Sequence, residues 1–217
     1  MVAAALPKVL VTGFDAFGGD TLNPSWLAAQ ALHGRRIAGH KVTAAQLPTM
    51  FGDSLDVLRA LLLTHRPALV LCLGQAGARA ALSLERVAIN INDARIADNA
   101  QAQPVDTPVV PGAPAAYFTR LPVKAMLQAL QRAGIAAEVS QTAGTFVCNH
   151  VFYGLMHELA TRRGFKTVRG GFMHVPWLPE QGLPSMPLDD MVRGIALALR
   201  CALTTRQDTR QAAGALH

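Results

Sequence analysis

The chain has 217 residues, of which 51% are hydrophobic and 16% are charged, and this composition predicts one compact domain rather than a disordered protein. The net charge is +6, but the basic residues are scattered and form no stripe interleaved with aromatics, which argues against a nucleic-acid partner. The three cysteines are an odd number without CxxC spacing, which argues against both a disulfide framework and a zinc site.

Short apolar runs alternate with amphipathic stretches along the chain. Residues 8–12 predict a strand that leads into a glycine-rich loop, and Asn23 and Pro24 then supply the N-cap and first position of a helix over residues 25–32. Further strands are expected over residues 41–47, 68–73, 82–91, 135–140 and 168–175. Further helices are expected over residues 52–65, 123–132, 147–163 and 188–203.

This alternation predicts an α/β fold in which a mixed, mostly parallel sheet carries helices on both faces. A single domain over residues 1–203 is expected, followed by a polar tail over residues 204–217 that frays. Residues 93–116 hold four prolines and no periodic pattern, so they predict a long loop that serves as a lid, a binding loop or an interface arm.

The location of the protein also follows from what the chain lacks. No apolar run approaches the ~18 residues of a membrane span, and the N-terminus has no charged region of the kind that begins a signal peptide. We therefore expect a cytoplasmic protein without a membrane partner.

The residue with the clearest chemical potential is Cys148, which follows a small-residue turn and opens a helix. Free N–H groups at a helix start favour a thiolate and could also receive an oxyanion. Many free cysteines are instead buried packing residues. Cys72, inside an apolar strand, and Cys201, on the apolar face of the last helix, fit that description better than Cys148 does.

A cysteine hydrolase also needs a base and a group that orients this base. His174 is the favoured base among seven histidines, because it ends a strand of the expected core. Glu85 interrupts an apolar strand and is the favoured carboxylate, although a surface position paired with Arg86 or Arg95 is the alternative. Asp93 and Asp98 are weaker candidates.

No metal or phosphate site is expected from the sequence. Cys148 and His150 form a Cys-x-His pair, but no further ligands accompany them. The glycine pairs at residues 18–19 and 74–77 match neither a P-loop nor a dinucleotide fingerprint.

Several blocks of sequence together resemble the pyroglutamyl-peptidase I family of cysteine peptidases. They run in the family's order from near the N-terminus to residue 176, which is far more specific than any single motif. The blocks are residues 11–19 (VTGFDAFGG), 23–25 (NPS), 74–77 (GQAG), 85–90 (ERVAIN), 93–99 (DARIADN), 142–149 (TAGTFVCN) and 173–176 (MHVP).

The resemblance implies a cytosolic exopeptidase that removes N-terminal pyroglutamate, folded as one three-layer α/β/α domain, without a cofactor and commonly a homotetramer. It implies that Cys148 is the nucleophile, His174 the base and then the acid, and Glu85 the orienting carboxylate. The implied substrate-binding residues are Phe14, Phe17, Gln75, Ile96, Phe146 and Val147.

Two other functions remain as alternatives. One is a catalytically silent relative that binds small ligands, against which the presence of all three candidate catalytic residues argues. The other is a nucleoside- or phosphate-handling transferase on a similar sheet, but the loop at residues 18–19 has no adjacent lysine or arginine. The role of Arg95 is also open, since it could pair with Glu85 or fasten its own loop between Asp93 and Asp98.

Overall fold

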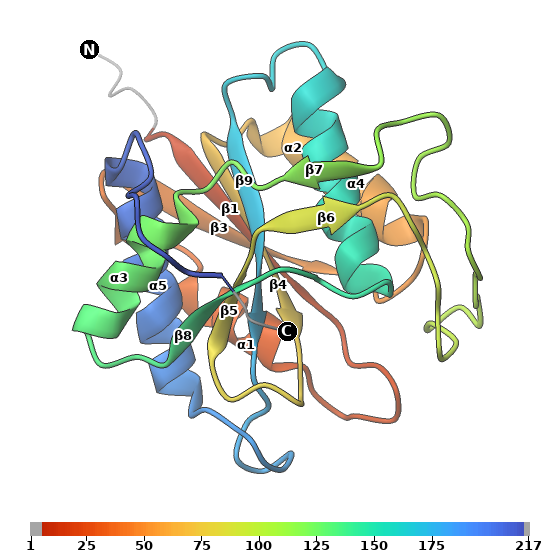
Figure 1. Ribbon diagram of the computed structural model, residues 1–217, viewed down its shortest axis with the longest axis horizontal. Coiled ribbons are helices and arrows are strands. Elements are labelled where there is room, and N and C mark those ends of the chain that lie inside the picture. The colour runs from red at the N-terminus through yellow and green to blue at the C-terminus, as the bar shows by residue number, and fades with distance from the viewer. Residues whose placement is uncertain (1–5, 215–217) are drawn as a thin grey trace.

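The computed structural model describes residues 6–214 and contains a seven-stranded sheet covered by helices on both faces (Figure 1). In spatial order the strands are β2 (Arg36–Ile37), β3 (His40–Leu47), β1 (Lys8–Phe14), β4 (Leu69–Gln75), β9 (Arg169–Val175), β5 (Leu82–Glu85) and β8 (Ala137–Ser140). Strands β3, β1, β4 and β9 are mutually parallel, and β5 is parallel to β8. Because β2 and β5 run antiparallel to β3 and β9, the sheet is mixed and mostly parallel, as predicted.

The sheet separates two apolar cores. Helices α1 (Pro24–Leu32), α3 (Val123–Arg132) and α5 (Leu188–Thr204) pack on one face, and α2 (Asp53–His65) and α4 (Val147–Thr161) pack on the other. Successive side chains of β4 enter opposite cores: Leu71 and Leu73 point toward α1 and α5, whereas Cys72 points toward α2 and α4. Burial on both faces explains why this strand is apolar throughout.

The expected strand over residues 82–91 is wrong, because the chain breaks at Arg86 and forms two strands in different sheets. β5 stays in the main sheet, while β6 (Val87–Ile89) pairs with β7 (Ala116–Phe118) in a two-stranded sheet against α4. β2 and β7 were not expected, since strands of two and three residues are too short to show a period.

The expected long loop lies between β6 and β7 and extends to one side of the molecule (Figure 1). Asn90 fastens it internally: its side-chain oxygen accepts from the Val110 N–H, and its amide group donates to the carbonyls of Val110 and Ala113. A bridge between Asn92 and Thr107 adds a second tie.

The start of α1 positions the end of β1. Asn23 caps the helix by accepting from the Ser25 N–H, and Pro24 occupies its first turn, as predicted. The Ser25 hydroxyl in turn accepts from the Phe14 N–H at 3.0 Å. A Cβ at Gly13 would lie 2.4 Å from the Ser25 carbonyl oxygen, so the close contact between β1 and α1 requires glycine there.

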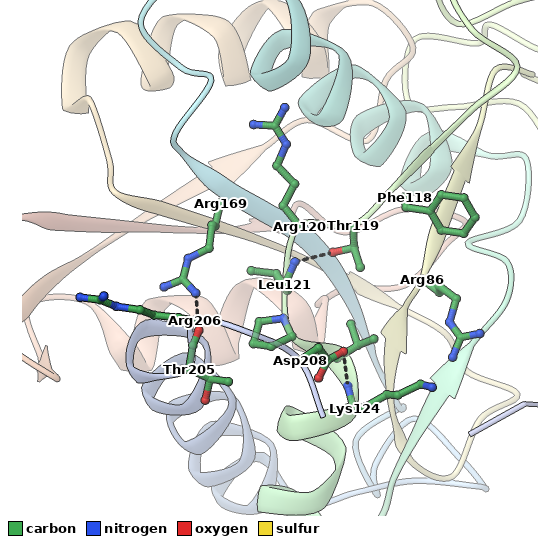
Figure 2. A pocket seen from close by; sticks show the side chains of 12 residues that line it. Arg86, Phe118, Thr119, Arg120, Leu121, Lys124, Arg169, Thr205, Arg206 and Asp208 are labelled. Atoms are coloured by element: carbon green, nitrogen blue, oxygen red, sulfur yellow. Dashed lines mark hydrogen bonds between the residues drawn. The ribbon is translucent and has the colours of Figure 1, made fainter. Parts of the chain in front are cut away.

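The described part of the C-terminal tail lies beside the first turn of α3, where it borders a cavity of about 400 Å³ (Figure 2). The Asp208 carboxylate accepts from the N–H groups of Lys124 and Ala125, and Arg169 donates to the Thr205 carbonyl. This cavity is at the first residue of β9, roughly 16 Å along the strand from His174. The division into a domain over residues 1–203 and a separate frayed tail stays a prediction.

Among residues 6–214, no helix has both the length and the apolar character needed to cross a membrane.

Candidate active site

The candidate nucleophile lies at the junction of a helix and the central sheet. Cys148 is the second residue of α4, which confirms the expectation that it opens a helix. A Cβ built on Gly74, near the end of β4, would lie 2.8 Å from the Cys148 Sγ atom. The sulfur therefore rests against the bare Cα of Gly74, at the carboxyl end of a central parallel strand.

His174 is brought to the same place by strand register. β4 and β9 are parallel neighbours, and Gly74 pairs with His174. Paired residues on adjacent strands point to the same face of a sheet, so the imidazole lies on the face that holds the cysteine sulfur. The centroids of the His174 and Phe172 rings are 4.9 Å apart. A Cβ built on Gly74 would also meet the Phe172 ring, so this ring lies beside the same position as the sulfur.

Glu85 completes this group from the antiparallel neighbour β5. Its Oε1 atom accepts a hydrogen bond from His174 Nδ1 at 2.8 Å, and its side chain is fully buried. Because an ionised carboxylate can only accept, the Nδ1 atom carries the hydrogen and Nε2 remains for proton transfer. The alternative of a surface glutamate paired with Arg86 or Arg95 is therefore wrong. The cation that contacts Glu85 is Arg79, at 2.7 Å.

The surroundings of Cys148 favour the thiol over the thiolate in the resting protein. Burial, followed by the charge of Glu85, raises the pKa of the Cys148 thiol to about 12, while the charge of Arg79 lowers it. Position at a helix start is thus outweighed by desolvation. A base must therefore take the proton as the sulfur attacks, and His174, the register partner of Gly74, is the candidate for this role.

The other two cysteines are packing residues, as expected. Burial raises the pKa of the Cys72 thiol to about 12 inside the core, and Cys201 packs half-buried on α5. All three cysteines are free.

The residues expected to bind substrate divide into an accessible group and a buried group. Phe17 and Phe146 are half-buried, with ring centroids 6.0 Å apart, and Ile96 is 46% exposed. Phe14 and Val147 are buried in the apolar core between the sheet and helices α2 and α4. The half-buried Gln75 donates to Asp20 and accepts from Gln181, which ties the end of β4 to the loop after β1 and to the segment that follows β9.

A cavity of about 240 Å³ opens beside the accessible group. Its lining residues are Asp93, Arg95, Ile96, Thr145 and Phe146. Arg95 is exposed at this rim instead of pairing with Glu85. Asp98 is a loop anchor, since its carboxylate accepts from the N–H groups of Phe51, Ala100 and Ala102.

Several residues of this region were missed by sequence reasoning. Phe51 places its ring edge-to-face on Phe146 at 5.4 Å, and no motif marks it in the sequence. Asn149 accepts from the Ile89 N–H and donates to the carbonyls of Ile89 and Ile91, so it ties α4 to β6. Because Asn149 directly follows the candidate nucleophile in the sequence, it could have been named as a residue that positions the start of this helix.

His150 is a buried structural histidine beneath the aromatic group. Its Nε2 atom accepts from the Gly52 N–H, and its Nδ1 atom donates to Asn92 Oδ1 at 2.9 Å. Acceptance at Nε2 requires the neutral ring, and the edge-on contact with Phe51 adds apolar surroundings. Burial, and secondarily the charge of Arg59, lowers the pKa of His150 to about 4.

We expect His150 to make the protein less stable in mild acid. Its pKa is about 4 when folded and about 6.5 when unfolded, so its contribution is complete above pH ~6.5 and is lost as the pH falls toward 4. The expected loss is about 3 kcal/mol over this range. Urea unfolding of wild type and His150→Gln measures it, and the variant should show the flatter dependence on pH.

The matched control is His33→Gln. His33 also accepts a backbone N–H, from Ala44, but it is exposed. This variant should retain the pH dependence of the wild type, and an equally steep dependence in His150→Gln would contradict the expectation.

Among residues 6–214, no group of three or more histidine, cysteine, aspartate or glutamate side chains is arranged to hold a metal ion. The absence of a cofactor stays a prediction.

Comparisons with known proteins show which family this chain resembles over nearly its whole length. A family model described as "Pyroglutamyl peptidase" matches residues 7–205. Pyrrolidone-carboxylate peptidase of Cupriavidus taiwanensis is 56% identical, and the match covers 98% of this chain and 100% of that protein. Pyrrolidone-carboxylate peptidase 1 of Ralstonia nicotianae is 54% identical with the same coverage.

Solved structures agree as well. The crystal structure of pyroglutamyl peptidase I from Bacillus amyloliquefaciens matches with a TM-score of 0.91 and 46% identity, covering 94% of this chain and 100% of that one. A variant of pyrrolidone carboxyl peptidase from Pyrococcus furiosus matches with a TM-score of 0.87 and 40% identity, covering 90% and 98%. The α/β fold class is thereby confirmed, and the chain belongs to the pyroglutamyl peptidase family.

Proposed function

We propose that this protein hydrolyses the amide bond after an N-terminal pyroglutamyl residue, with Cys148 as nucleophile, His174 as base and Glu85 as orienting carboxylate. The observation that carries this assignment is the convergence of β4, β5 and β9. Their registers place the His174 ring between the Glu85 carboxylate and the Gly74 position on which the cysteine sulfur rests.

The chemistry follows from these positions. The Cys148 sulfur attacks the pyroglutamyl carbonyl carbon while its proton passes to His174, and Glu85 stabilises the imidazolium. Backbone N–H groups at the start of α4 receive the oxyanion. The intermediate collapses to a thioester as His174 protonates the departing amine. His174 then takes a proton from water, which attacks the thioester, releases pyroglutamate and restores the thiol.

The aromatic group suits this substrate. Pyroglutamate is a flat, uncharged lactam, so its site needs apolar walls and a few hydrogen-bonding groups rather than a carboxylate for a free amino terminus. We assign Phe17, Phe146 and Ile96 to the accessible walls and Gln75 to the polar border. Phe14 and Val147 are assigned a supporting role, since both belong to the buried core against which Phe146 packs.

Replacement of Phe17 and of Phe14 should have different consequences. We expect Phe17→Ala to raise KM about tenfold with little loss of stability, because the ring is half-buried. Phe14→Ala should lower the free energy of unfolding by about 3–5 kcal/mol, since that ring is 2% exposed and packs on Phe172. Steady-state kinetics and urea unfolding of both variants check this. A lower kcat at unchanged KM in Phe17→Ala would contradict the assignment.

The test of the proposed activity is release of a fluorescent amine from a pyroglutamyl amide, compared with an otherwise identical prolyl amide. A site that pairs with the lactam carbonyl should reject the prolyl compound strongly, because its own polar groups would be left unpaired. Turnover of the pyroglutamyl amide alone supports the proposal. Folded, reduced wild type that turns over neither compound would favour the catalytically silent, ligand-binding relative.

We also propose a cytoplasmic location and assembly as a homotetramer. Three free cysteines suit a reducing compartment, and the low charged fraction of 16% suits a subunit that buries part of its surface. Light scattering of the purified protein tests the assembly.

A further inference from the structure

Arg79 joins two parts of the candidate site that the proposed mechanism treats separately. It lies in the turn between β4 and β5, and its side chain is 26% exposed. Nη1 donates to Glu85 Oε1 at 2.7 Å, and Nη2 donates to the Thr142 carbonyl at 3.1 Å. Thr142 belongs to the turn that leads into α4. One guanidinium therefore connects the partner of His174 to the segment that delivers Cys148.

The Glu85 carboxylate needs a cation. It is fully buried, and its Oε2 atom has no hydrogen-bond partner within residues 6–214. Oε1 receives both His174 Nδ1 and the Arg79 guanidinium. A buried carboxylate held by neutral donors alone is costly, whereas a bonded arginine compensates much of that cost. Arg79 and His174 both donate to the Oε1 atom of Glu85, so Arg79 helps to keep the carboxylate in contact with the histidine.

The same charge acts on the nucleophile. Besides burial, the groups whose charge shifts the pKa of Cys148 are Glu85 on β5, Cys72 on β4, and Arg79 in the turn between these strands. His174 faces the same position from β9, where it pairs with Gly74. A thiolate that forms here meets the carboxylate of Glu85, and like charges repel. Arg79 is the neighbouring group that opposes this repulsion.

We propose that Arg79 is a positioning residue of the active site, which holds the Glu85 carboxylate against His174 and balances its buried negative charge. This inference rests on the proposed roles of Cys148, His174 and Glu85. The inference adds to these three residues an arginine in the turn after β4 that balances the charge of Glu85.

The test is the pH dependence of Cys148 alkylation by iodoacetamide, followed by mass spectrometry of the peptide that contains this cysteine. Arg79→Gln should move the midpoint of the rate profile upward by about one pH unit, the size expected for loss of one nearby charge. At any fixed pH below the midpoint, this shift appears as an alkylation rate about tenfold lower than that of the wild type. Arg79→Lys keeps the charge but lacks the guanidinium that donates to both Glu85 and the Thr142 carbonyl, so its midpoint should lie between those of wild type and Arg79→Gln. A purely structural role would lower stability without moving the midpoint.

The matched control is Arg162→Gln. Arg162 also bonds a buried glutamate, Glu158, but at the far end of the same helix, roughly 20 Å from Cys148. This variant should keep the wild-type midpoint. An unchanged midpoint in Arg79→Gln would overturn the proposal.

If Arg79→Gln does not fold, the proposal is tested by comparing Glu85→Gln with the double variant. Glu85→Gln and the double variant with Arg79→Gln both lack the buried carboxylate, so neither leaves an unpaired buried anion. The double variant should have the higher midpoint, and equal midpoints would overturn the proposal. Alkylation requires no peptide substrate. Failure of the wild type to cleave a pyroglutamyl amide would therefore count against the proposed function, and not against Arg79.

Discussion

Cys148→Ser should abolish cleavage of a pyroglutamyl amide, with kcat reduced by at least about 10⁴-fold. A serine hydroxyl in the same position is a far poorer nucleophile than a sulfur, because an alcohol is much harder to deprotonate than a thiol. Stability should change little, because the substitution changes one atom of a half-buried side chain at the helix start. The measurement is initial-rate kinetics on protein whose unfolding curve matches that of the wild type.

The control for this variant is Cys201→Ser. Cys201 is a free, half-buried cysteine on α5, where its sulfur contacts the Thr205 hydroxyl at 3.6 Å. It should retain wild-type kinetics and lose no sensitivity to thiol alkylation. Residual turnover in Cys148→Ser close to that of Cys201→Ser would remove Cys148 from the role of nucleophile.

Gly74→Ala should lower kcat by about 10²-fold or more although no reacting group is altered. The added methyl group would lie 2.8 Å from both the Cys148 sulfur and the Phe172 ring, and one of them must move. Displacement of a nucleophile by about 1 Å is enough to cost roughly 10²-fold in rate. Kinetics, together with alkylation of Cys148, would show whether the sulfur has moved out of reach of His174.

Gly214→Ala is the comparison, because a Cβ at that position has no neighbour within 4 Å. It should behave as wild type in both assays. Full activity in Gly74→Ala would mean that the sulfur need not rest on β4, and the geometric basis for pairing Cys148 with His174 would fail.

Much of the fold was predictable because it depends on local signals. The helix that begins at Asn23-Pro24 has its capping residues in sequence, and α5 appears in the structure one residue longer than expected. The strand over residues 82–91 could not be predicted correctly, since the break at Arg86 depends on the pairing of β6 with β7, which lies about thirty residues later in the chain.

The candidate site divides in the same way. The residue types and order of Cys148, His174 and Glu85 were readable from linear blocks, and the structure brings the three together. The arginine that contacts Glu85 could not be identified from the sequence, because Arg79 lies six residues before Glu85 and Arg95 ten residues after it, and no local pattern favours either one. The turn after β4 brings Arg79 to the carboxylate, whereas the loop after β6 carries Arg95 to the rim.

By itself, the sequence determined the class of fold, the family and the identity of the candidate catalytic residues, because each rests on a local pattern or a linear motif. Only the tertiary structure showed that the Cys148 sulfur packs against Gly74, that Phe14 is buried in the core, and that His150 joins Gly52 and Asn92 as a neutral ring. Those features depend on strand register and on contacts between segments far apart in the chain, and no local pattern encodes either.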